Sequence, residues 1–260
     1  MKRDFFFWIC SLCAIAILAF IIGPMFHLIT EPAPEMLKKT ILDRDVQKAI
    51  FLSLYTSSAA AMISLIFGTP LAFLLARNNF KGKKIIESII DLPIVIPHPV
   101  VGIAILSLTG RNHWIGRALA DMGIRVMGSI TGIIIVLTFV GMPFYINAAK
   151  NGFESISPRL EYVSRSLGAS MTGTFFRITF PLAFRSMLMG LIMCTARAIS
   201  EFGAVVIVAY HPMNAPVMIY ERFEAHGLTY SLPISVWLLL ISLAVFLVFR
   251  MISVNAKEPA

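Results

Sequence analysis

The sequence predicts an all-α integral membrane protein with about six transmembrane helices in a single domain, residues 1–260. Apolar residues make up 58% of the chain, only 14% of residues are charged, and the mean hydropathy is +0.82. Soluble domains are typically about half apolar and about a quarter charged. The apolar residues also gather in runs of about twenty, the length that an α-helix needs to cross the hydrocarbon core. No repeat or low-complexity tract divides the chain.

Six apolar runs are the candidate membrane spans. They are Phe5–Leu28, Ala49–Ala76, Ile85–Leu108, Ser129–Ala149, Ala183–Ala209 and Pro233–Ser253. The first run follows a basic start, as the core of a signal peptide would. It is longer than such a core and no A-x-A cleavage site follows it, so we expect a retained helix.

The distribution of Lys and Arg between the spans predicts that both termini lie in the cytoplasm. The side with more of them carries Lys2, Arg3, Arg77, Lys81, Lys83, Lys84, Lys150, Arg159, Arg165, Arg177, Arg185, Arg250 and Lys257. The other side carries Lys38, Lys39, Arg44, Lys48, Arg111, Arg117, Arg125 and Arg222. The positive-inside rule places the richer side in the cytoplasm. We therefore expect a multi-pass protein of the cell membrane.

The third span contains three prolines within seven positions, at Pro93, Pro97 and Pro99. Each proline removes a backbone donor and clashes with the preceding turn. Broken helix at membrane depth persists only where protein or a water-filled cavity satisfies the freed groups. We therefore expect this segment to line the interior or a subunit contact. His98 either touches a permeating anion or hydrogen-bonds a carbonyl freed by a proline, and Pro97 and His98 are pathway candidates.

The fifth span carries Arg197, Ser200, Glu201 and Gly203. Charged residues at the bilayer centre cost about 2.5–3.5 kcal/mol each on insertion scales, so they usually have a function. Arg197 and Glu201 are four positions apart and can pair on one helix face. One interpretation is an internal ion pair that fixes helix packing. The other places Arg197 near an anion path with Glu201 as its restraint.

The longest loop on the predicted cytoplasmic side, about residues 151–182, has the pattern of a docking element. Apolar residues recur there at helical spacing from Leu160, and Glu161 and Arg165 lie one turn apart. Gly168 is placed to end this helix, and a second piece is expected to end at Pro181. A short helix, a glycine turn and a second piece outside the membrane would fit a groove on another protein.

This loop resembles the cytoplasmic loop of importer permeases of the ATP-binding-cassette class. Their pattern is E-A-A-x-x-x-G, nine residues, then I-x-L-P. Gly168, Ile178 and Pro181 match its glycine, isoleucine and proline. The chain departs from the pattern because Tyr162 occupies the glutamate position, with Glu161 one place earlier. Val163 and Ser164 replace the alanines, and Phe180 replaces the leucine.

Three further segments are similar to the oxyanion permeases for molybdate, tungstate and sulfate. They are residues 69–77, 91–102 and 197–204. The run Ile94–His98 looks most like the molybdate/tungstate branch, and the sulfate or thiosulfate branch stays open. The resemblance implies a homodimer of permeases, two ATPase subunits on the cytoplasmic side and an external oxyanion-binding protein. ATP and Mg would bind the partner ATPase, and this chain would carry no cofactor.

The resemblance also implies roles for particular residues. Contact with the ATPase would involve Glu161, Tyr162, Arg165, Ser166, Leu167, Gly168, Ala169, Ser170 and Pro181. The pathway or gate would involve Pro97, His98, Arg197, Ser200, Glu201 and Gly203. The external loop 210–231 would contribute to docking of the binding protein.

Several other functions find little support in the sequence. The net charge of +8 comes from short clusters between apolar spans, which argues against nucleic acid. Residues 168–174 resemble a P-loop but lack its lysine, so we expect no ATP hydrolysis by this chain. The five histidines form no H-E-x-x-H, and no metal site or catalytic residue is expected. An ion-coupled secondary transporter and an intramembrane enzyme remain the alternatives from other classes.

Overall fold

The computed structural model describes residues 5–255, so Lys2, Arg3 and Lys257 lie outside the described residues, as does the side chain of Arg250. The described part is helical. Its helices are α1 (Phe5–Thr30), α2 (Pro34–Leu42), α3 (Arg44–Arg77), α4 (Lys83–Val95), α5 (His98–Thr109), α6 (Trp114–Asp121), α7 (Ile130–Ser155), α8 (Pro158–Ser166), α9 (Met171–Thr174), the π-helix η1 (Phe175–Thr179), α10 (Phe180–Ile199), α11 (Gly203–Val208), α12 (Ala215–His226) and α13 (Leu228–Asn255).

Within residues 5–255, five continuous helical segments are long and apolar enough to cross a membrane. The pair α4 and α5 supplies a sixth candidate span, although it bends by 110° at its break. The predicted all-α fold with about six spans is therefore confirmed. The proline-rich third span is broken, as its sequence indicates.

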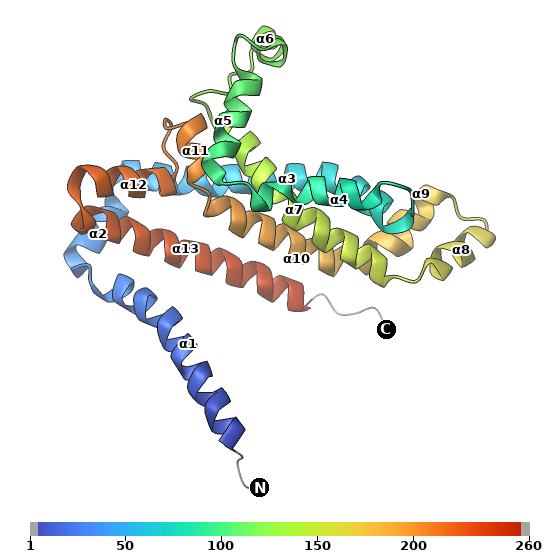
Figure 1. Cartoon of the computed structure of the whole chain (residues 1–260), viewed down its shortest axis with the longest axis horizontal. Helices are drawn as coiled ribbons and strands as arrows, with labels where there is room; N and C mark the ends of the chain where they lie inside the picture. Colours follow the sequence, from blue (N-terminus) through green and yellow to red (C-terminus); the bar gives the residue numbers. More distant parts are fainter. Residues whose placement is uncertain (1–4, 256–260) are drawn as a thin grey trace.

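The centre of the molecule is a layer of α3, α7 and α10, which lie side by side along its length (Figure 1). Small residues let these helices approach closely, as is common between membrane helices. A Cβ atom at Gly68 would lie 2.8 Å from Cδ1 of Tyr145, and one at Gly190 would lie 2.9 Å from the Cβ of Ala148. Ser64, fully buried on α3, donates to the carbonyl of Ala60 within its own helix. The Ser64 hydroxyl is thus satisfied inside its own helix.

The remaining helices are arranged around this layer (Figure 1). α13 lies beside α10, and α1 diverges from the body with its main contacts on α13. α5 and α6 project away from the layer, whereas α8 and α9 extend from one end and α2 and α12 lie at the other. We call the end that carries α8 the inner end, because the charge distribution predicts that it faces the cytoplasm.

Polar contacts join the inner part of α4 to α7, in addition to the packing of Ile90 against the apolar core. Glu87 pairs with Lys150 at 2.7 Å, and Asn147 donates to Asp91 at 2.7 Å. Lys83 lies 3.6 Å from Glu154. The only buried residue of α4 is Pro93, and its other apolar side chains are at least partly exposed. These links therefore hold α4 against the body.

The fifth span differs from the expected Ala183–Ala209. Continuous helix runs from Met171 through η1 to Ile199, and it is interrupted before α11. Pro181 therefore lies in the first turn of α10 instead of ending a separate external piece. The helix continues through this proline with a widened preceding turn, in which the Phe180 N–H bonds to the carbonyl of Phe175, five positions back.

Candidate functional site

Two broken helices meet near the middle of the molecule. α4 ends at Val95 and α5 begins at His98, while α10 ends at Ile199 and α11 begins at Gly203. The breaks touch because Gly203 has no side chain: a Cβ there would lie 3.0 Å from the Cβ of His98 and 3.3 Å from Pro99 Cδ. Discontinuous helices that cross within a membrane often form ion and substrate sites.

Arg197, Glu201 and His98 form a charged cluster at these breaks. Arg197 Nη2 donates to Glu201 Oε2 at 2.7 Å, and the predicted pairing of these two residues is confirmed. The same nitrogen lies 2.7 Å and 3.1 Å from the ring nitrogens of His98, whose Nδ1 is 3.4 Å from the Glu201 carboxylate. Glu201 lies just beyond the end of α10, and its Oε1 accepts the Ala204 N–H at 2.9 Å. The carboxylate thus caps α11 as well as pairing with Arg197.

The cluster is buried on one side and accessible on the other. The Glu201 side chain is 1% exposed, whereas those of Arg197 and His98 are 21% and 37% exposed. Ser200, which ends α10, is exposed, and its Oγ lies 3.4 Å from Arg197 Nη1. Pro97, the residue before α5, is exposed as well. Within residues 5–255, the polar contacts found for His98 are with this pair and none is with a proline-freed carbonyl.

The inner segment after α7 folds as the sequence pattern suggests as far as Gly168. Ser157 and Pro158 begin α8, and Gly168 follows its end with a φ of +91°. Such a left-handed residue at a helix end favours glycine. The Ala169 N–H returns to the Ser164 carbonyl at 3.2 Å and closes the turn. Ser170 then caps α9 through the Gly173 N–H.

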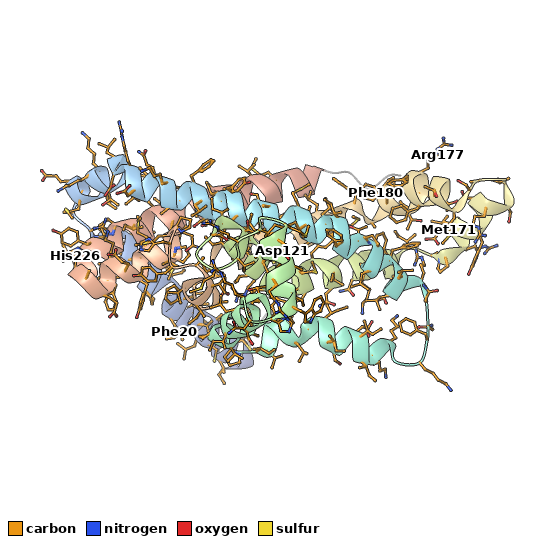
Figure 2. All side chains as sticks on the ribbon, turned by 90° about the horizontal axis from the view of Figure 1, so that it is seen from above. Phe20, Asp121, Met171, Arg177, Phe180 and His226 are labelled. Carbon is orange, nitrogen blue, oxygen red and sulfur yellow. The ribbon has the colours of Figure 1, made fainter. Side chains whose placement is uncertain are left out.

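One face of α8 is exposed and largely apolar. Leu160, Val163 and Leu167 recur at helical spacing on it, and each is about half exposed or more. A hollow of about 630 Å³ lies between α8 and α9, and Arg159 and Arg177 contribute to its lining. The other predicted contact residues on this segment are exposed as well: Tyr162, Arg165, Ser166, Gly168, Ala169 and Ser170. Figure 2 shows Met171, Arg177 and Phe180 gathered at this end of the molecule, with His226 of α12 at the opposite end.

Glu161 faces the body of the chain rather than this exposed surface. Arg77 Nε donates to Glu161 Oε1 at 2.8 Å, and Nη2 lies 2.7 Å from the same oxygen. Thr179 Oγ1 donates to that oxygen at 3.0 Å, and Arg77 Nη1 donates to the Phe153 carbonyl at 2.8 Å. Glu161 therefore joins α8 to α3 and η1, instead of pairing with Arg165 one turn along.

Arg77 and Thr179 are the residues that the sequence pattern did not single out. Arg77 stood among the basic residues that predict orientation and at the end of the family-like segment 69–77, without a predicted partner, and Thr179 lay in a stretch expected to be external. They lie 84 and 18 positions from Glu161, and no local spacing rule connects them. Pro181, which the resemblance grouped with α8, is exposed and belongs to the first turn of α10.

Comparison with known protein families finds a match over residues 68–260. The family is described as binding-protein-dependent transport system inner membrane component. The molybdate/tungstate transport system permease protein WtpB of Pyrococcus abyssi is 43% identical over 98% of this chain and 99% of its own length. WtpB of Methanocaldococcus jannaschii is 42% identical over 91% and 92%. The sulfate transport system permease protein CysT of a Synechocystis species is 31% identical over 76% of this chain and 70% of its own length.

Solved structures show the same fold at low sequence identity. A bacterial importer of the acidic polysaccharide alginate contains a chain with a TM-score of 0.76 and 18% identity, covering 97% of this chain and 96% of that chain. The methionine transporter MetNI in an inward-facing conformation gives a TM-score of 0.65 at 15% identity, covering 82% and 96%.

Proposed function

The chain belongs to the family of binding-protein-dependent inner membrane transport components, and on that premise we propose that its substrate is molybdate or tungstate. It is the permease of an ATP-driven importer and has no catalytic function of its own. The observation that carries the proposal is identity of 41–43% to four molybdate/tungstate permeases over at least 91% of the chain. Family membership excludes the two alternative functions, an ion-coupled secondary transporter and an intramembrane enzyme.

The cluster at the helix breaks supports an anionic substrate. Arg197 offers nitrogen donors at the exposed side of the cluster, and the His98 ring lies beside them. A partly exposed arginine within a membrane span is costly when it faces lipid. A second copy of the chain that encloses this face would remove that cost. We therefore expect a homodimer with Pro97, His98, Arg197, Ser200, Glu201 and Gly203 along or near the pathway.

Family members work with an ATPase and an external binding protein. For this chain we place the ATPase contact on the exposed face of α8, including Leu167 and Gly168. An unpartnered apolar helix face outside the membrane is suited to insertion into a groove. Two ATPase subunits would then hold ATP and Mg beneath the permease dimer. The binding protein would dock at the opposite end, around α12, where residues 210–231 lie.

The substrate assignment is tested by ATPase activity of the complete importer in vesicles. The binding protein is added after loading with molybdate, tungstate or sulfate in turn. We expect stimulation by molybdate and tungstate to exceed that by sulfate. Sulfate as the strongest stimulant would instead support the sulfate branch, which the 31% identity to CysT favours as second candidate. No stimulation by any loaded protein would contradict the oxyanion assignment.

The coupling surface is tested by placing a large side chain at Gly168. Among the described residues nothing lies within 4 Å of a Cβ atom there, so tryptophan would project from the turn. We expect G168W to insert normally but to lose transport. Gly82 is a matched control, because it also has a positive φ and open space in an inner loop. Normal transport by G168W, or equal loss in G82W, would contradict the placement on α8.

A further inference from the structure

Among residues 5–255, the partners found for Arg197 leave some of its donors unused. An arginine has five N–H donors in a planar fork, which matches tetrahedral oxyanions well. Nη2 is directed at Glu201 and His98, whereas the nearest acceptor described for Nη1 is Ser200 Oγ at the long distance of 3.4 Å. Because the side chain is 21% exposed, the outer edge of the guanidinium is open to a ligand.

Glu201 behind it has the opposite surroundings. Its carboxylate is fully enclosed, and each oxygen has a partner, Arg197 Nη2 on one side and the Ala204 N–H on the other. A buried charge of this kind does not leave its partner without a large cost. Glu201 therefore stays in place while a ligand arrives, and it neutralises Arg197 from behind.

The groups around the open edge complete a small polar surface. The exposed Ser200 hydroxyl and the partly exposed His98 ring both lie beside the guanidinium. His98 also begins α5, a helix of 12 residues, so the positive end of that helix dipole lies at the same place. Four polar features thus lie together at the two breaks: the Arg197 charge, the Ser200 hydroxyl, the His98 ring and the start of α5.

We propose that Arg197, Ser200 and His98 form a transit site for a divalent tetrahedral oxyanion, and that Glu201 keeps the affinity of this site low. The inference rests on the proposed function and adds to it a site and a reason for its charge balance. A path must bind its ion well enough to admit it and weakly enough to release it. In a medium of low dielectric, an unneutralised arginine would hold a dianion too strongly for release.

The test is equilibrium binding of tungstate to the permease–ATPase complex in nanodiscs at low salt, without binding protein. We expect E201Q to bind tungstate about tenfold more tightly than the wild type, because Arg197 is no longer neutralised. Glutamine keeps an acceptor for the Ala204 N–H, which favours folding. The double variant R197Q/E201Q is expected to lose the gain. E221Q, which alters a pair with Arg222 on α12, is the control and is expected to match the wild type.

An affinity for tungstate that is unchanged in E201Q would overturn the proposal. So would a gain that persists in R197Q/E201Q, because the anion would then bind elsewhere. If E201Q does not assemble, S200A provides the test, since it removes the hydroxyl beside the guanidinium and no charge. We expect S200A to slow tungstate transport about threefold while the loaded binding protein still stimulates ATPase activity; unchanged transport would overturn the site.

Failure of the proposed function gives a different result. In that case the wild-type complex shows no ATPase stimulation by a tungstate-loaded binding protein. With normal stimulation of the wild type and no gain in E201Q, the transit site alone is wrong.

Discussion

The inner end and the helix breaks each contain an Arg–Glu pair, and the two pairs differ in what they connect. Arg77 and Glu161 are 84 positions apart and join α3 to α8, with side chains 12% and 16% exposed. Arg197 and Glu201 are four positions apart and close the end of one helix. The inner pair also gathers Thr179 and the Phe153 carbonyl, whereas the other gathers His98 and the Ala204 N–H.

The comparison teaches that the same ion pair has different consequences at different sequence separations. A pair within one turn shapes local backbone and leaves one edge free for other contacts. A pair across 84 positions fixes a short external helix, which has no buried residues of its own, to the membrane body. The inner pair should therefore matter most for stability, and the pair at the breaks should matter most for the substrate.

The largest effect is expected from Glu161→Ala. It leaves Arg77 without its charged partner and releases α8, so we expect a loss of about 3 kcal/mol in the free energy of unfolding. Chemical denaturation of the purified permease in detergent measures it. Arg159→Ala on the same helix is the control, because Arg159 is exposed, and should change stability by less than about 0.5 kcal/mol. Equal losses in both variants would contradict the special role of the inner pair.

Glu201→Ala should cost less, about 2 kcal/mol, because Arg197 keeps His98 and partial access to solvent. The Ala204 N–H loses its acceptor in this variant but keeps one in Glu201→Gln. Denaturation of the two variants side by side should therefore show Glu201→Ala as the less stable. If Gln were as destabilising as Ala, the capping of α11 would contribute nothing.

Lys150→Gln tests whether the sequence separation of an ion pair alone determines how much stability is lost when the pair is broken. Lys150 pairs with Glu87 from 63 positions away, with side chains 17% and 25% exposed. This pair has fewer additional partners than Arg77–Glu161, so we expect a loss of about 1.5 kcal/mol. The same denaturation assay measures this loss. A loss as large as that of Glu161→Ala would mean that sequence separation matters more than the additional hydrogen bonds around the pair.

Thr179→Val should give the smallest change. It removes the hydroxyl that donates to Glu161 while keeping the side-chain shape at a fully buried position. We expect a loss of about 1 kcal/mol. Thr179→Ser retains the donor and serves as the matched variant. A more stable serine variant supports the hydrogen bond, whereas a more stable valine variant would show that packing dominates at this site.

The features that were predicted correctly from the sequence are those that depend on local patterns along the chain. Apolar run length gave the spans, three prolines gave the break in the third span, and four-residue spacing gave the Arg197–Glu201 pair. The start of the fifth span was missed because Arg177 and Pro181 read as external, although a widened turn carries the helix through both. The Arg77–Glu161 pair was missed because only tertiary packing, of α3 on α7 and of α8 on η1, brings it together.

The pairing of Arg77 with Glu161 has a mechanical consequence for α3. α3 is a single helix of 34 residues, about 50 Å long at 1.5 Å per residue, with α8 attached at its inner end. A displacement of α8 can therefore tilt the whole of this long helix. If α3 tilts about its midpoint by roughly 5°, each end moves by about 2 Å. The outer end of α3 begins at Arg44, beside α2. A displacement of α8 can therefore move a segment at the opposite side of the membrane.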